Sequence, residues 1–256
     1  MSARICRDGC TYPQIVVLAL SFTRGPWAWL ACLLSATWMH GAAARGWSGS
    51  VGVLSDKVVY GLSQSGGDPS AVFDLAWQGD TGWSLSGGVA TLGHGSQRPD
   101  AEVSLGGGIG GVGGPLGDSG AWQLSYLRFE TLGSAATRRH GYDQLSLAYD
   151  WGENLQLSVL YTGGFYAPAP GGGRVPSAAL ITEAVWHQPL ARRWSLDLGA
   201  GRVHYRSSSL RDFNYGSIGI SWGLGPVQVF ATRVFSNSRA STAAGSRAVV
   251  SVLWGF

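Results

Sequence analysis

Six carboxylates stand on the polar side of short runs in which polar and apolar residues alternate: Asp56, Asp74, Glu102, Asp150, Glu183 and Asp197. Because successive side chains of a strand point to opposite faces, we expect these acids to share one face with Ser, Thr and Gln. Rings of carboxylates around a pore favour cations. The pattern therefore predicts an acidic, cation-favouring lumen. The alternative is an interior filled by its own side chains, with the acids hydrogen-bonded to their polar neighbours.

Four basic residues fall instead on the apolar side of their runs, close to long polar segments: Lys57, Arg128, Arg202 and Arg233. Lysine and arginine bind phosphate oxygens through charge-assisted hydrogen bonds. At the rim of a membrane barrel, such residues would contact the phosphates of lipopolysaccharide. Solvated charge above the membrane is the alternative interpretation.

Catalytic chemistry has weaker support. His204 and Asp212 can approach each other across segment 206–211, which brings the serines of 207–209 nearby. A Ser/His/Asp set is recognised by geometry, however, and serine is abundant in this chain. The stretch "GGGIGG" (106–111) fits G-x-G-x-x-G without the strand–turn–helix context of a dinucleotide site. No metal-ligand spacing stands out, so we expect no metal, no cofactor and no enzymatic activity.

The elements that carry these residues are alternating runs rather than helical stripes. Twelve runs follow residue 45, at 47–59, 70–78, 82–92, 101–111, 121–130, 142–151, 154–162, 178–187, 194–205, 213–222, 226–234 and 246–256. Their connections alternate between short turns and long polar loops, which is typical of outer-membrane barrels. We therefore predict an all-β fold, a transmembrane antiparallel up-and-down β-barrel of 12 strands, with both termini periplasmic.

Aromatic residues support this arrangement. Tryptophan prefers the lipid–water interface, and nine Trp share the apolar parity at the short-turn ends of the runs. They predict a periplasmic aromatic girdle of Trp47, Trp77, Trp83, Trp122, Trp151, Trp186, Trp194, Trp222 and Trp254. A second girdle at the opposite ends is predicted from Tyr60, Tyr142, Tyr161 and Tyr205.

The last run ends on the apolar Phe256, with Val250, Val252 and Trp254 on the same face. A closed barrel leaves no exposed sheet edge, so we expect this run to pair with the one that begins at Trp47. A terminal Phe after alternating apolar residues also resembles the assembly signal that the barrel-assembly machinery reads.

Residues 1–44 predict a signal peptide cleaved after Ala44, because basic residues precede a short apolar run (26–39) and small residues follow it. The run is shorter than the roughly 20 residues of a membrane-spanning helix. All three cysteines lie in this leader, so the mature domain, residues 45–256, has no disulfide framework. Without the leader the chain is nearly neutral, and we expect no nucleic acid partner.

The order S-D, G-x-S-Q, D-P and then G-W-x-L-x-G in segment 51–92 resembles the Gcw-CHP family of proteobacterial outer-membrane barrel proteins, whose function is unassigned. The matching residues are Ser55, Asp56, Gly61, Ser63, Gln64, Asp68 and Pro69. The chain departs from the family at Lys57, where an aromatic is usual, and at Tyr60, where an arginine is usual. The resemblance implies a barrel and supplies no catalytic residues.

Together the patterns predict a porin-like passive channel for small solutes in the outer membrane of a Gram-negative bacterium. The alternative is a closed barrel whose extracellular loops act in surface binding or envelope support. Loop 163–177 would discriminate between them: folded inward it would constrict a pore, and standing outward it would present a binding surface. Expected partners are outer-membrane lipid and lipopolysaccharide, the barrel-assembly machinery, and small solutes or cations; a homo-oligomer is left open.

Overall fold

The computed structural model describes residues 46–93, 101–113, 120–133, 141–152, 154–169, 173–238 and 245–256. The predicted signal peptide lies outside these residues. No helix in the described part of the chain is long and apolar enough to cross a membrane.

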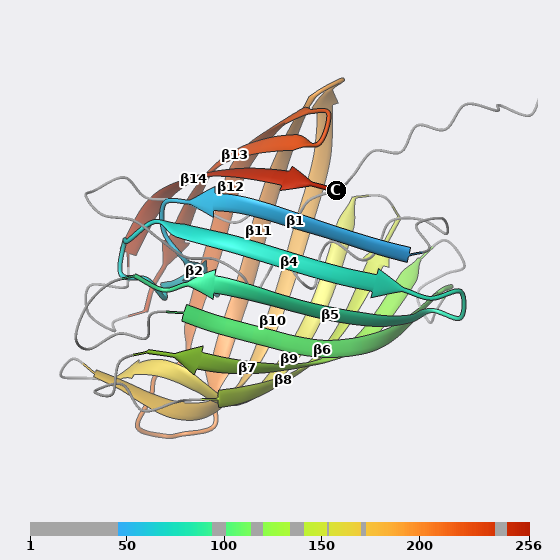
Figure 1. Ribbon diagram of the computed structural model, residues 1–256. Coiled ribbons are helices and arrows are strands. Elements are labelled where there is room, and N and C mark those ends of the chain that lie inside the picture. The colour runs from blue at the N-terminus through green and yellow to red at the C-terminus, as the bar shows by residue number, and fades with distance from the viewer. Residues whose placement is uncertain are drawn as a thin grey trace, which may run out of the picture.

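Twelve antiparallel strands form a closed barrel in which each strand pairs with its neighbours along the chain (Figure 1). The wall consists of β1 (Gly46–Leu54), β4 (Ser70–Gln78), β5 (Trp83–Thr91), β6 (Ala101–Val112), β7 (Ala121–Leu132), β8 (Gly141–Trp151), β9 (Leu155–Ala169), β10 (Gly173–Ala191), β11 (Trp194–Tyr205), β12 (Phe213–Leu224), β13 (Val227–Ser236) and β14 (Gly245–Gly255). A short hairpin, β2 (Val58–Val59) and β3 (Leu62–Ser63), does not belong to the wall. The predicted 12-stranded barrel is confirmed.

The outer surface of the wall is apolar. In β14, for example, Val252 and Trp254 are exposed, whereas Ser251 and Leu253 are buried inside the barrel. The same alternation turns Leu, Ile and Val outward on the other wall strands. Lipid offers no hydrogen bonds to backbone groups, so a closed sheet with an apolar exterior is the strand arrangement that fits a bilayer. This is a transmembrane barrel.

Two boundaries differ from the expectation. Strand β1 ends at Leu54 rather than at residue 59, because the chain there turns into the β2–β3 hairpin. Strands β9 and β10 continue through most of segment 163–177, which was expected to be a loop, with a register shift between Ser177 and Ala178. Gly164, with φ of 141°, adopts a backbone conformation there that other residues avoid. The segment thus extends the wall at the long-loop end (Figure 1).

The barrel closes between β1 and β14. Residues Ser50–Leu54 pair with Ser251–Gly255. Beyond them Gly49 and Phe256 exchange two backbone hydrogen bonds of 2.9 and 3.0 Å. The Phe256 ring stacks on Phe73 of β4, with ring centroids 6.4 Å apart. The predicted closing strand is confirmed, and both ends of the described chain lie at the short-turn end of the barrel.

Candidate functional site: a hairpin inside the lumen

Residues 55–69 enter the barrel from the long-loop end and form the β2–β3 hairpin (Figure 1). Val59 pairs with Leu62 across a turn of Tyr60 and Gly61, whose φ angles are 50° and 76°. Positive φ at both central residues is the geometry of a type I′ turn, which follows the twist of a hairpin. A tyrosine there is strained, and such strain persists where the surroundings hold the residue in place.

The hairpin reaches from one wall of the barrel to the other. At its base, Lys57 Nζ donates a hydrogen bond of 2.5 Å to Glu102 Oε1 on β6. At its tip, the Tyr60 ring packs against Tyr215 on β12, with centroids 6.3 Å apart. Strands β6 and β12 are six positions apart in the ring of twelve, so they lie on opposite walls. The hairpin therefore bridges the lumen.

An apolar core surrounds the hairpin. Val58, Val59, Tyr60 and Leu62 are each at most 3% exposed and belong to a single buried cluster. Every wall strand except β6 contributes inward side chains to this cluster, namely Leu54, Val72, Ala90, Leu127, Phe129, Tyr142, Leu160, Ala179, Ile181, Val203, Tyr205, Phe213, Phe230, Val234, Val249 and Leu253. Side chains thus fill this level of the lumen, as the interior of a narrow barrel permits.

Polar contacts anchor the base of the hairpin. Asp56 is fully buried and accepts hydrogen bonds from Ser63 Oγ at 2.5 Å and Ser65 Oγ at 2.7 Å. Arg247 Nη1 of β14 donates to the other oxygen of Asp56 at 2.9 Å. Tyr60 Oη, near the tip, donates to Gln144 Oε1 at 2.8 Å. Buried charges persist in proteins when they are paired in this way.

The prediction that Lys57 contacts lipopolysaccharide is wrong. The residue is completely buried inside the barrel. It was assigned to the outer face because β1 was expected to continue past it, but the strand ends at Leu54 and the alternation ends with it. Arg247, conversely, was missed, although its parity with the inward Val249 and Ser251 indicated that it faces the lumen.

The predicted tyrosine girdle is wrong for three of its four residues. Tyr60, Tyr142 and Tyr205 are between 3% and 7% exposed inside the barrel, whereas Tyr161 is 46% exposed on the outside. Tyr142 Oη donates to Glu102 Oε2 at 3.3 Å, so its hydroxyl belongs to the polar network around the hairpin. The Tyr60, Tyr142 and Tyr205 side chains therefore help fill the lumen and do not lie at the membrane surface.

Four of the six predicted lumen acids lie on the inner wall and take no part in the ion pairs at the base of the hairpin. Asp150 accepts a hydrogen bond from Gln156 at 3.0 Å, and Asp197 is bonded to His187 Nδ1 at 2.5 Å. Both oxygens of Asp74 are buried without a hydrogen bond of ordinary geometry, although its cross-strand neighbour Ser50 and Lys57 act on it electrostatically. Among the described residues, none of Asp74, Asp150, Glu183 and Asp197 forms an ion pair with Lys or Arg.

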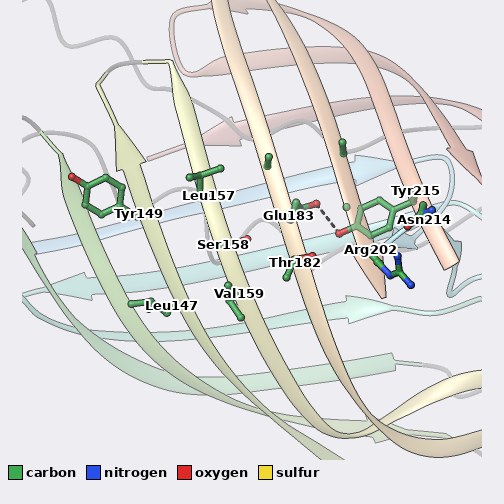
Figure 2. Close-up of a pocket in the computed structure, with 13 residues that line it drawn as sticks. Leu147, Tyr149, Leu157, Ser158, Val159, Thr182, Glu183, Arg202, Asn214 and Tyr215 are labelled. Atoms are coloured by element: carbon green, nitrogen blue, oxygen red, sulfur yellow. Dashed lines mark hydrogen bonds between the residues drawn. The ribbon is translucent and has the colours of Figure 1, made fainter. Parts of the chain in front are cut away.

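The fourth acid, Glu183, accepts a hydrogen bond from a tyrosine that reaches it across a glycine of the strand between them. Tyr215 on β12 lies opposite Gly201 on β11, which lies opposite Glu183 on β10. The Tyr215 ring covers Gly201, since a Cβ there would lie 2.3 Å from Tyr215 Cζ. Its hydroxyl then donates to Glu183 Oε1 at 3.1 Å (Figure 2). The same ring therefore contacts both the tip of the hairpin and an acid of the wall.

On the outer face, the three predicted arginines have different partners. Arg128 is paired with Glu130 at 2.6 Å and with Asp143 at 3.0 Å. Arg233 Nε donates to Ser246 Oγ at 2.5 Å. Arg202 reaches Asp212 at 3.5 Å and borders a groove of about 690 Å³ on the outside of β8–β12.

The predicted approach of His204 and Asp212 is confirmed. His204 Nδ1 lies 2.6 Å from Asp212 Oδ2, and the Tyr205 amide donates to Asp212 Oδ1 at 3.1 Å. Partial burial acts to raise the pKa of Asp212, but hydrogen bonds from His204 and the Tyr205 amide outweigh it and hold that pKa below its ordinary value.

A hydrolytic site also needs a nucleophile in contact with the base. Ser207 and Ser209 bond to each other at 2.7 Å, and no serine bonds to His204 among the described residues. Within the same residues, no group of three or more His, Cys, Asp or Glu side chains could hold a metal ion.

The nine predicted girdle tryptophans lie toward the short-turn ends of their strands. Five of them are 45–69% exposed: Trp47, Trp83, Trp151, Trp194 and Trp254. Trp47 lies opposite Trp77, and Trp194 lies opposite Trp222. Trp122 and Trp186 are partly exposed on the same outer face.

No protein-family model matches the chain, and no curated protein matches its sequence. Among solved structures, the KdgM porin is similar over 82% of this chain and 99% of its own, at 8% identity and a TM-score of 0.49. The NanC porin is similar over 82% and 97%, at 10% identity and a TM-score of 0.47. The translocator domain of the autotransporter NalP from Neisseria meningitidis is similar over 87% and 91%, at 12% identity and a TM-score of 0.47. Similarity at this level carries no statement about function.

Proposed function

We propose that this protein is an outer-membrane barrel that is closed at rest by the β2–β3 hairpin, and that it conducts small cations only when the hairpin is displaced. The observation that carries the proposal is the hairpin bridging opposite walls, from Glu102 on β6 to Tyr215 on β12. A permanently open porin has a polar, water-filled lumen. Here apolar side chains around the hairpin occupy the long-loop half instead.

The outer-membrane location is supported by the apolar exterior and by the tryptophans gathered at the short-turn end. Short turns face the periplasm in such barrels, which would place both termini there. Three of the residues that carry the Gcw-CHP resemblance, Asp56, Gly61 and Ser63, shape the hairpin.

Cation preference of the displaced state is supported by the wall acids. Asp74, Asp150, Glu183 and Asp197 would remain in the lumen without arginine or lysine partners, and carboxylates around a pore favour cations. Small polar residues such as Ser146, Ser158 and Ser217 share the inner face of the wall with these acids. In the closed state, the protein would act through its extracellular loops, in surface binding or envelope support.

The test is conductance in planar bilayers with a salt gradient. The refolded wild-type chain should show no steady channels. A variant in which residues 57–66 are replaced by a Gly-Ser linker retains Asp56 and Arg247, and it should conduct with a reversal potential that favours cations.

Steady channels of porin size from the folded wild type would overturn the closed state. Anion preference in the linker variant would overturn the acidic lumen. Because the linker variant can fail to fold, the wild-type recording alone is sufficient to refute closure. Folding is checked by circular dichroism before each recording.

A further inference from the structure

We propose that the outer groove on β8–β12 binds one molecule of lipid A, the phosphorylated glycolipid of lipopolysaccharide, with an acyl chain in the groove and a phosphate on Arg202. This inference rests on the proposed outer-membrane location. The groove opens on the lipid-facing side of the wall and has a volume of about 690 Å³. It extends over five neighbouring strands, roughly 19 Å at the usual strand spacing.

Small side chains make the floor of the groove. Ala184 on β10 lies opposite Ala200 on β11, where most neighbouring outward positions carry larger residues. Leu157 and Val159 on β9 also line the groove (Figure 2), and Leu157 lies in register with Ala184. This side of the groove is therefore apolar, as a hydrocarbon chain requires.

Polar groups gather at the other side of the groove. Arg202 lies in register with Thr182 on β10 and Asn214 on β12, and all three line the groove. The Arg202 side chain is 61% exposed, and its described partner is Asp212 at 3.5 Å, longer than an ordinary charge-assisted bond. A guanidinium has five N–H donors in a planar fork that matches phosphate, so most remain available for an anion.

The local charge favours an anionic head group. Arg206 and Arg211 lie in the loop that joins the two strands of Arg202 and Asn214, and both are exposed. Against these three arginines the segment has one carboxylate, Asp212. Arg128 differs, because two carboxylates already contact it. The excess of positive charge therefore lies beside the groove at Arg202, at the long-loop end of the wall.

The experiment counts lipid A molecules retained by the folded, detergent-solubilised protein in native mass spectra. Wild type should retain one lipid A. Arg202→Gln removes the phosphate contact, and Ala200→Leu fills the groove while keeping an apolar outer face; each should weaken binding by about tenfold or more. Arg192→Gln is the control, since this exposed arginine lies in the short turn between β10 and β11 at the opposite end of the barrel, and it should bind as wild type.

Equal binding by all four proteins would overturn the proposal, as would displacement of lipid A by equimolar phosphatidylethanolamine, which would indicate unspecific lipid. A dimer lost in Ala200→Leu would assign the groove to a second copy and would also overturn it. These readouts are independent of conductance. Failure of lipid A binding leaves the closed-barrel result intact, and an open wild-type channel leaves the groove result intact.

Discussion

Lys57 and Glu102 form a buried ion pair inside the barrel, with side chains 1% and 7% exposed. The pair joins the base of the hairpin to β6, and the tip of the same hairpin reaches β12. A charge left alone at such a site has neither water nor a counter-ion. The pair therefore links the stability of the barrel to the placement of the hairpin.

We expect Lys57→Met to lower the free energy of unfolding by about 3–5 kcal/mol, because it leaves Glu102 buried without its cation. Glu102→Leu should act in the same direction, because it leaves Lys57 buried without its anion. The double variant Lys57→Met/Glu102→Leu should recover part of the loss, since neither charge is then isolated. Urea unfolding followed by tryptophan fluorescence measures all three. Additive losses in the double variant would show that the pair is not coupled.

Gly61 and Gly67 provide a matched test of hairpin packing. Both have positive φ, 76° and 95°, so Ala at either position is strained by about 1–2 kcal/mol. A Cβ at Gly61 would lie 2.5 Å from Tyr215 Cβ, whereas at Gly67 the nearest atom is 4.0 Å away. We expect Gly61→Ala to cost at least about 1 kcal/mol more than Gly67→Ala, because it also overpacks the core.

Only Gly61→Ala should also raise the frequency of conducting events in the bilayer recordings, since its added methyl group pushes the hairpin tip from the wall. Equal urea midpoints for the two variants would contradict the observed packing of the tip. Conducting events of equal frequency in the Gly61→Ala and Gly67→Ala proteins would show that packing of the hairpin tip does not control closure of the channel.

Gly201→Ala should displace the Tyr215 ring, because its Cβ would lie 2.3 Å from that ring. The hydrogen bond to Glu183 would be lost with it, leaving a partly buried carboxylate less well satisfied; we expect a loss of about 2 kcal/mol or more in unfolding free energy. Gly223→Ala on β12 is the control, since nothing lies within 4 Å of its Cβ. A Gly201→Ala protein as stable as the control would refute the ring placement.

The pH dependence of the loop after β11 follows from Asp212. Its folded pKa is lowered, so its contribution to loop stability is present above the unfolded value of about 3.9 and is lost as the pH falls through the folded pKa. The Tyr205 amide donates to Asp212, and its NMR shift should titrate with a midpoint below that value. In Asp212→Asn the titration should disappear. A midpoint above about 4 would mean that the hydrogen bonds do not stabilise the carboxylate.

The wall strands and their inner and outer faces could be predicted from the sequence, because the alternation of a strand depends only on adjacent residues. The outward positions of Val252 and Trp254, for example, follow from their neighbours alone. The hairpin could not be predicted in this way. Its anchors are distant in sequence, with Lys57 contacting a residue 45 positions away and Asp56 contacting one 191 positions away. Loop 163–177 likewise has the composition of a turn, yet cross-strand bonds make most of it a strand pair.

The seam between β1 and β14 has a consequence for the order of assembly. The hairpin follows directly after β1, while its contacts at Tyr215 and Arg247 come from strands synthesised last. The interior can be packed only when the sheet curls round and the two chain ends meet at Gly49 and Phe256. Closing the seam and filling the centre are then one cooperative event, and contacts of such long sequence separation form slowly. Until that event, a nascent chain would keep its hairpin unburied, so a partly folded barrel would expose the apolar side chains of Val58, Val59 and Leu62 that the finished one buries.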